Sequence, residues 1–207
     1  MESGPFDRDA FLIDQKLTLV VNRYAVRAFD RGAGTGEPLA FCQQKRMALK
    51  EDLRFYADEA RSREVFRIKA RRVVDLGGRY DVVDAAGVRI GVLERRFKRS
   101  LLRATWAILD RDEREIAWAQ EESVVIAILR RAVNLAELIP LVGPFLVVIP
   151  VPYHFTFQVG ERAIGRLSRV IGLRDRYVLE IHGDPERAID RRLVVALGVG
   201  LDALQSR

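Results

Sequence analysis

The sequence is poor in cysteine and lacks a leader-like start, and each scarcity excludes a class of protein. Cys42 is the only cysteine among 207 residues, so neither a disulfide framework nor a cysteine zinc site can form within the chain. The first residues, MESGPFDRDAF, show neither the basic region nor the apolar core of a secretory signal. These features predict a cytoplasmic protein without a metal site.

Groups that carry catalysis are also scarce. His154 and His182 are the only histidines, and both flank strand-like apolar residues without a nucleophile motif or a histidine–carboxylate spacing. The glycine-rich stretch 32–36 is followed by Glu37 and Pro38 rather than by a helix, so we expect a hairpin loop there and not a phosphate-binding loop. The sequence predicts no catalytic residue and no cofactor.

Charge is plentiful and dispersed. Charged residues make up 31% of the chain and hydrophobic residues 49%, which is typical of a soluble globular domain. The formal net charge of +6 favours attraction to a polyanion: nucleic acid, an acidic protein or an anionic membrane face. Charge alone does not choose among these partners.

The longest apolar segment, 193–201, lies near the end of the sequence and has no polar residue. Asp184 as N-cap and Pro185 as first helical residue predict a helix over 185–205. The apolar centre spans only ~14 Å, less than half of a hydrocarbon core, so we expect no membrane span. A helix that is apolar on all sides must be buried on all sides, and Gly198 indicates close packing against a wall.

The remainder of the chain has strand patterns. Residues 79–91 form a hairpin signature, and the same shape recurs 26 positions later over 106–116. Looser copies lie at 24–41 and 155–165, which indicates a repeated, meandering antiparallel sheet. Between hairpins, as in 65–72, apolar and basic residues alternate, so one face of the sheet is buried and one is wet.

These patterns predict a mainly β fold: a closed antiparallel barrel around a buried C-terminal helix. Closure removes the edge strands and creates an interior that the helix can fill. Residues 1–10 are expected to form a short tail, and residues 11–207 a single domain.

Two motifs resemble the LURP-one-related proteins, which belong to the group that also includes the phospholipid scramblases and the tubby carboxy-terminal domain. They are the hairpin Tyr80-Asp81-Val82 with Asp84 and Gly87, and the ending Asp190-Arg191-Arg192-Leu193 to Leu201-Asp202. The resemblance runs from about Phe11 to Leu204. It implies a barrel of about twelve strands wrapped around the hydrophobic C-terminal helix.

One stretch departs from the repeat. Residues near 122–136 have the periodicity of an amphipathic helix, and 138–153 are uncharged and rich in proline. In one interpretation this stretch packs on the barrel, with 145–151 as a core strand. In the other it contacts a membrane or a partner, through four apolar residues: Leu141, Val142, Phe145 and Leu146.

A basic cluster is the candidate site for an anionic ligand. Its members are Arg95, Arg96, Lys98 and Arg99, with Lys45 and Arg46 after the first hairpin. Basic side chains near an anionic surface each contribute about 1 kcal/mol of binding. The alternative is a solvated rim of the barrel.

Together these features predict non-enzymatic binding of an anionic lipid surface, such as phosphoinositide-type head groups, or of a protein partner. Tubby domains bind phosphoinositides and scramblases act at membranes, but this chain lacks the cysteine-rich tract of the scramblases. A cytoplasmic protein peripheral to the membrane is therefore expected. The alternatives are an enzyme or small-ligand binder at the barrel mouth, and non-specific nucleic-acid binding through the basic surface.

Overall fold

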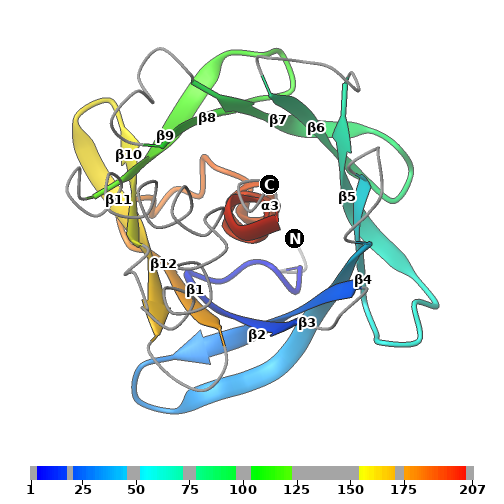
Figure 1. The fold of residues 1–207 in the computed structure, drawn as a ribbon. Coiled ribbons are helices and arrows are strands. Elements are labelled where there is room, and N and C mark those ends of the chain that lie inside the picture. The colour runs from blue at the N-terminus through cyan, green and yellow to red at the C-terminus, as the bar shows by residue number, and fades with distance from the viewer. Residues whose placement is uncertain are drawn as a thin grey trace, which may run out of the picture.

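A computed structural model describes residues 4–17, 21–45, 52–71, 78–96, 104–122, 154–170 and 175–203. In these residues twelve strands form a closed antiparallel barrel, and one helix, α3 (Arg191–Ala203), lies inside it (Figure 1). The predicted fold is therefore confirmed.

Each strand pairs with its neighbours in sequence, and β1 closes the barrel against β12. The strands are β1 (Ala10–Leu17), β2 (Val21–Asp30), β3 (Gly34–Lys45), β4 (Asp52–Tyr56), β5 (Glu64–Ala70), β6 (Arg79–Asp84), β7 (Arg89–Arg95), β8 (Thr105–Leu109), β9 (Glu115–Glu121), β10 (His154–Val159), β11 (Arg162–Val170) and β12 (Arg176–Ile181).

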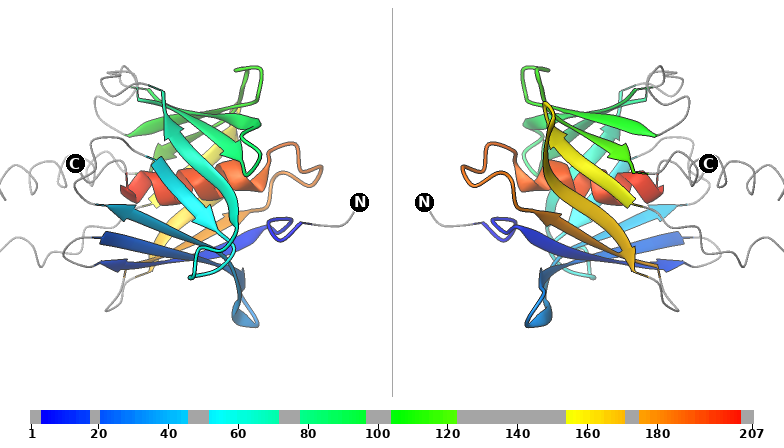
Figure 2. Two further views of the ribbon diagram at one scale, coloured as in Figure 1. Left: turned by 90° about the vertical axis from the view of Figure 1, so that its right-hand side faces the viewer. Right: turned by 90° about the vertical axis from the view of Figure 1, so that its left-hand side faces the viewer.

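Five turns whose residues are all described lie at one end of the barrel, here called the hairpin end. It holds the turns that follow the even-numbered strands β2 to β10. Because neighbouring strands run antiparallel, the odd-numbered strands end at the opposite end of the barrel. The helix α3 runs along the barrel axis from the hairpin end to the opposite end (Figure 2).

An aspartate organises the turn in several hairpins. The Asp84 carboxylate accepts a hydrogen bond from the Val88 amide at 2.8 Å, and Asp110 accepts one from the Arg114 amide at 2.9 Å. Asp30 accepts two amide bonds within its own turn. Aspartate is favoured in turns because its side chain can bond the backbone a few residues ahead. This chemistry explains why aspartate recurs in the sequence repeat.

The barrel interior is filled by apolar side chains and by α3. Phe66 and Ile68 of β5 are buried and belong to the core. The alternating residues Arg67 and Lys69 face outward, as the sequence pattern predicts. Every residue from 193 to 201 is buried. The sheet thus supplies the wall that an entirely apolar helix requires.

Glycine lets the helix and sheet approach closely, as predicted at Gly198. A Cβ atom on Gly198 would lie 2.9 Å from Cδ1 of Ile13 in β1. A Cβ atom on Gly91 of β7 would lie 2.4 Å from the Leu109 carbonyl oxygen and 2.9 Å from Cδ1 of Leu193. Side chains larger than hydrogen do not fit at these positions without movement of the neighbouring atoms.

The predicted start of the helix was wrong. The sequence placed it at Pro185 with Asp184 as N-cap, but α3 begins at Arg191. Asp190 caps the helix, since its Oδ1 accepts a hydrogen bond from the Arg192 amide at 2.9 Å. Asp184 instead caps the preceding turn by accepting hydrogen bonds from two backbone amides, those of Ala188 and Ile189. Two aspartates six residues apart can both serve as caps, and the sequence alone favoured the wrong one.

A buried ion cluster fixes the start of α3 to the rest of the chain. The Arg191 side chain is only 4% exposed, and it donates to Asp184 Oδ2 at 2.6 Å and to Asp9 Oδ1 at 2.9 Å. Burial by itself raises the pKa of Asp184, but hydrogen bonds from Arg191 and from the Ile189 and Ala188 amides outweigh it and lower that pKa. The cluster joins the segment before β1, the β12–α3 connection and the helix.

Two predicted features lie outside the described residues and stay predictions: the amphipathic helix near 122–136, of which only Glu122 is described, and the apolar stretch 138–153. Across the seven described ranges, no helix combines the length and the apolarity that a membrane crossing needs.

Candidate anion-binding site

The inside of the barrel is occupied by the core. Within the described part of the chain, no three histidine, cysteine or acidic side chains come together as a metal ion would require. Cys42 faces the core and is 3% exposed, and its burial raises the pKa of the thiol, as does the nearby charge of Asp52. Cys42 therefore packs as a small apolar residue, as expected from the sequence.

The structure describes only part of the predicted basic cluster. Lys45 is the last residue of β3 and Arg95 the last residue of β7, so both backbones reach the opposite end of the barrel. Seven predicted positions lie outside the described residues: Arg46, Lys98, Arg99, Leu141, Val142, Phe145 and Leu146. Those seven assignments stay predictions.

Arg95 and Arg96 do not form one cationic surface. Arg95 pairs in register with Trp106, a core residue that is 1% exposed, and so lies on the inner face of the sheet. Arg96 follows it and contacts two carboxylates, Glu94 at 3.4 Å and Glu115 at 2.8 Å. Because Arg96 already has anionic partners, it is a poor candidate for binding an external anion.

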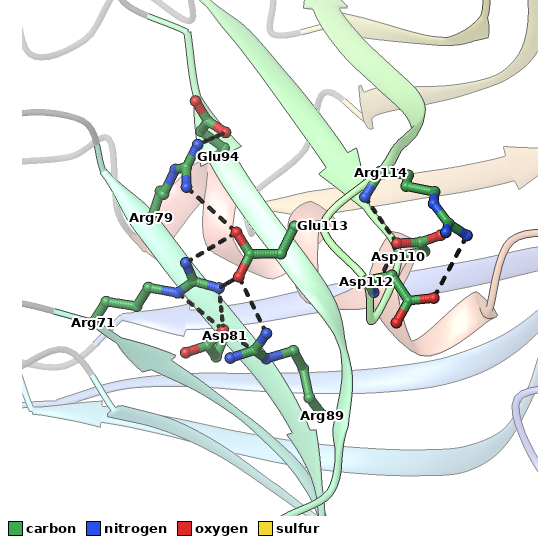
Figure 3. A network of polar contacts seen from close by, with 9 residues as sticks. All are labelled: Arg71, Arg79, Asp81, Arg89, Glu94, Asp110, Asp112, Glu113 and Arg114. Atoms are coloured by element: carbon green, nitrogen blue, oxygen red, sulfur yellow. Dashed lines mark hydrogen bonds and ion pairs between the residues drawn. The ribbon is translucent and has the colours of Figure 1, made fainter.

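Many other arginines are committed to ion pairs in the same way. Figure 3 shows Glu113, in the β8–β9 turn, surrounded by Arg71 at 2.7 Å, Arg89 at 3.2 Å and Arg79 at 3.5 Å. Asp81 and Glu94 add two more carboxylates, 2.9 Å from Arg71 and 3.0 Å from Arg79, so three acidic groups face three arginines. The hydrogen bond from Arg71 lowers the pKa of Glu113. This surface is balanced in charge and offers little attraction to an anion.

A groove on the outer face of β1 to β4 has a different character. It encloses about 320 Å³ and is bordered on one side by the β4–β5 hairpin, which projects beside β3 in Figure 1. Its lining residues are Asp14, Gln15, Lys16, Arg23, Tyr24, Ala25, Arg27, Phe41, Cys42, Gln43, Tyr56, Glu59 and Arg61. We call this hollow the β1–β4 groove.

The floor of the groove is a row of side chains across four strands. Asp14 pairs in register with Ala25, Ala25 with Phe41, and Phe41 with Tyr56. All four are partly buried. The methyl group of Ala25 between larger neighbours leaves the hollow, and Phe41 beside it gives the floor an apolar surface.

A second row consists of two basic side chains that face each other across neighbouring strands. Lys16 of β1 lies directly opposite Arg23 of β2, and both side chains are exposed. Like charges that face each other across strands destabilise a sheet. Among the described residues neither side chain has an ion-pair partner, in contrast to the arginines around Glu113. An anion bound between the two would relieve this repulsion.

Arg61 adds a third cation from the hairpin. Its backbone has φ of 61°, a conformation uncommon for a residue other than glycine. The turn holds it there, because the Arg61 amide donates to the Asp58 carbonyl at 3.1 Å and the Ser62 amide to the Asp58 carboxylate at 3.2 Å. Arg61 is exposed and, in the described part of the chain, also lacks an ion-pair partner.

The aspartate in the floor does not cancel this charge. Asp14 is held by Arg176 at 2.7 Å and by Arg27 at 3.8 Å. Its negative charge is thereby shared between two arginines. Glu59, the other acidic lining residue, is exposed and forms no ion pair with any described residue. Lys16, Arg23 and Arg61 therefore remain available to a ligand.

Sequence reasoning missed this site. Lys16 and Arg23 are seven positions apart, and only the register of the β1–β2 pair places them opposite each other. The sequence signal is weak there, because each basic residue follows a polar one, Gln15 before Lys16 and Asn22 before Arg23. The sequence instead favoured the contiguous basic run 95–99. Of its two described members, Arg95 faces inward and Arg96 is paired with carboxylates.

The comparison with known families agrees with the fold. No curated protein sequence matches the chain significantly. The sequence pattern of the LURP-one-related family matches residues 39–202, which covers most of the chain from β3 to α3. The chain therefore belongs to the LURP-one-related family.

Proposed function

We propose that this protein is a non-enzymatic binding module that attaches to anionic lipid surfaces through the β1–β4 groove. One observation supports the proposal above all others: three exposed cations that border the groove, Lys16, Arg23 and Arg61, have no acidic partner in the described part of the chain. An anionic surface supplies the missing negative charge. With α3 occupying the barrel axis, the outer face is where such a ligand would bind.

The size of the effect follows from electrostatics near a charged bilayer. Each basic residue close to an anionic surface contributes about 1 kcal/mol. Three such residues correspond to roughly a hundredfold in the partition coefficient. This attraction weakens as salt rises, since the Debye length shortens from about 10 Å at 0.1 M to about 3 Å at 1 M.

Co-sedimentation with vesicles tests the proposal. The protein should bind vesicles of phosphatidylcholine with phosphatidylglycerol, and not vesicles of phosphatidylcholine alone, at low ionic strength. The triple variant K16Q/R23Q/R61Q should lose binding roughly a hundredfold.

The chain offers a matched control. Lys69, Arg111 and Arg162 are also exposed and, in the described residues, also lack ion-pair partners, but they lie outside the groove. The variant K69Q/R111Q/R162Q removes the same charge and should bind almost as well as the natural protein. Equal losses in both variants would mean that net charge, and not the groove, governs attachment.

A further inference from the structure

We infer that the β1–β4 groove discriminates by the charge of the bound head group and selects phosphate monoesters over singly charged anions. This inference rests on the proposed function, since it names the ligand chemistry of the same groove. Its basis is the directly opposed pair Lys16 and Arg23, together with Arg61 from the hairpin.

The cation pair sets the charge that the ligand must carry. A phosphate monoester has a second pKa near 6 and therefore carries close to two negative charges at neutral pH. Such a group can neutralise Lys16 and Arg23 together. A phosphate diester, a sulfonate or a carboxylate carries one charge, so one member of the opposed pair would stay uncompensated beside it.

The oxygens of the group also match the donors. Arg23 offers several N–H donors in a planar fork, and Lys16 offers three donors on a flexible stem. Hydrogen bonds between ionised partners are shorter and about twice as strong as neutral ones. Arg61 borders the same groove from the hairpin, where its turn is fixed by Asp58.

The groove floor favours an apolar group attached to the phosphate. Ala25 and Phe41 form an apolar surface next to the cation pair, and Tyr56 continues the row. A ligand with carbon atoms attached to its phosphate can cover this surface, whereas inorganic phosphate cannot. We therefore expect a monoester with an apolar body, from either a lipid head group or a soluble metabolite.

Titration calorimetry with two soluble probes tests the discrimination. Phenyl phosphate and benzenesulfonate share a ring and a tetrahedral head but differ by one charge at pH 7.5. Phenyl phosphate should bind roughly tenfold more tightly or better, and the difference should shrink at pH 5, where its second charge is lost. Inorganic phosphate, which lacks the ring, should bind more weakly than phenyl phosphate.

Two double variants test whether the preference for phenyl phosphate arises in the β1–β4 groove. K16Q/R23Q should abolish the preference for phenyl phosphate, while R111Q/R162Q should retain it. Circular dichroism verifies that both variants fold, which is expected because all four side chains are exposed. Equal affinities for the two probes, or an unchanged preference in K16Q/R23Q, would overturn the inference.

Vesicles identify the source of the monoester. Stronger binding to phosphatidic acid than to phosphatidylglycerol at equal surface charge would support a lipid head group. Selective binding of phenyl phosphate without attachment to any anionic vesicle would support a soluble ligand, and would refute only the proposed lipid attachment. Groove-dependent attachment to phosphatidylglycerol with no charge discrimination would uphold the proposed function and refute this inference.

Discussion

Replacement of Arg191 by methionine probes the cluster that anchors α3. Methionine keeps an unbranched apolar stem of similar reach but removes the guanidinium. In the natural protein that group bonds Asp184 Oδ2 at 2.6 Å, Asp9 Oδ1 at 2.9 Å and the carbonyl oxygens of Ile189 and Asp184 at 3.0 and 3.1 Å. The substitution leaves the Asp184 carboxylate without its cation.

The expected decrease in the free energy of unfolding depends on how deeply each partner of Arg191 is buried. Asp184 and Arg191 are 9% and 4% exposed, and removing one partner of a buried ion pair costs about 3–5 kcal/mol. Asp9 is 57% exposed, so its own contact contributes below about 1 kcal/mol. We expect R191M to lower the free energy of unfolding by about 3–5 kcal/mol and D9N by less than about 1 kcal/mol.

Urea denaturation followed by tryptophan fluorescence measures both values, because Trp106 is buried in the barrel core. The double variant R191M/D184N should lose less than the sum of the two single variants, since it leaves no unpaired buried charge. The reasoning is refuted if R191M costs no more than D9N, or if the double variant shows strict additivity.

Two further predictions concern titratable groups. The pKa of Asp184 is lowered below its usual 3.8. Its contribution to the free energy of unfolding is therefore complete above pH 3.8 and is lost as pH falls through the lower pKa of the folded state. In urea titrations between pH 2 and 6, D184N should lack this dependence on pH. Cys42 is buried and its pKa is raised, so Ellman's reagent should label it only in urea; labelling of the folded protein at pH 8 would contradict its place in the core.

The fold could be predicted from the sequence because its signals are local and repeated. The alternation in 65–72 and the hairpins at 79–91 and 106–116 fixed strand positions, and an apolar segment with no wet face required an enclosing wall. The start of α3 was missed because Asp184 and Asp190 have the same local chemistry. In the fold, Asp184 pairs with the buried Arg191, which also bonds Asp9, 182 positions away, whereas Asp190 pairs with Arg192.

The candidate site could not be predicted in the same way. It depends on which outward-facing residues become neighbours across strands and on which cations find acidic partners. Arg96 looked available in sequence but pairs with Glu115, 19 positions away, whereas Arg23 has no partner in the described chain. A contiguous basic run does not predict where unpaired cations lie in a barrel, because the strand register decides whether each basic side chain contacts a carboxylate.

Hydrogen–deuterium exchange with and without anionic vesicles tests the central claim, that α3 stays inside the barrel while the outer groove binds. Amides of 193–201 should exchange slowest and be unchanged by vesicles, whereas β1, β2 and the hairpin 57–63 should gain protection. Faster exchange in α3 on vesicle binding, or protection confined to the β8–β9 turn with Arg111 and the start of β11 with Arg162, would contradict the account.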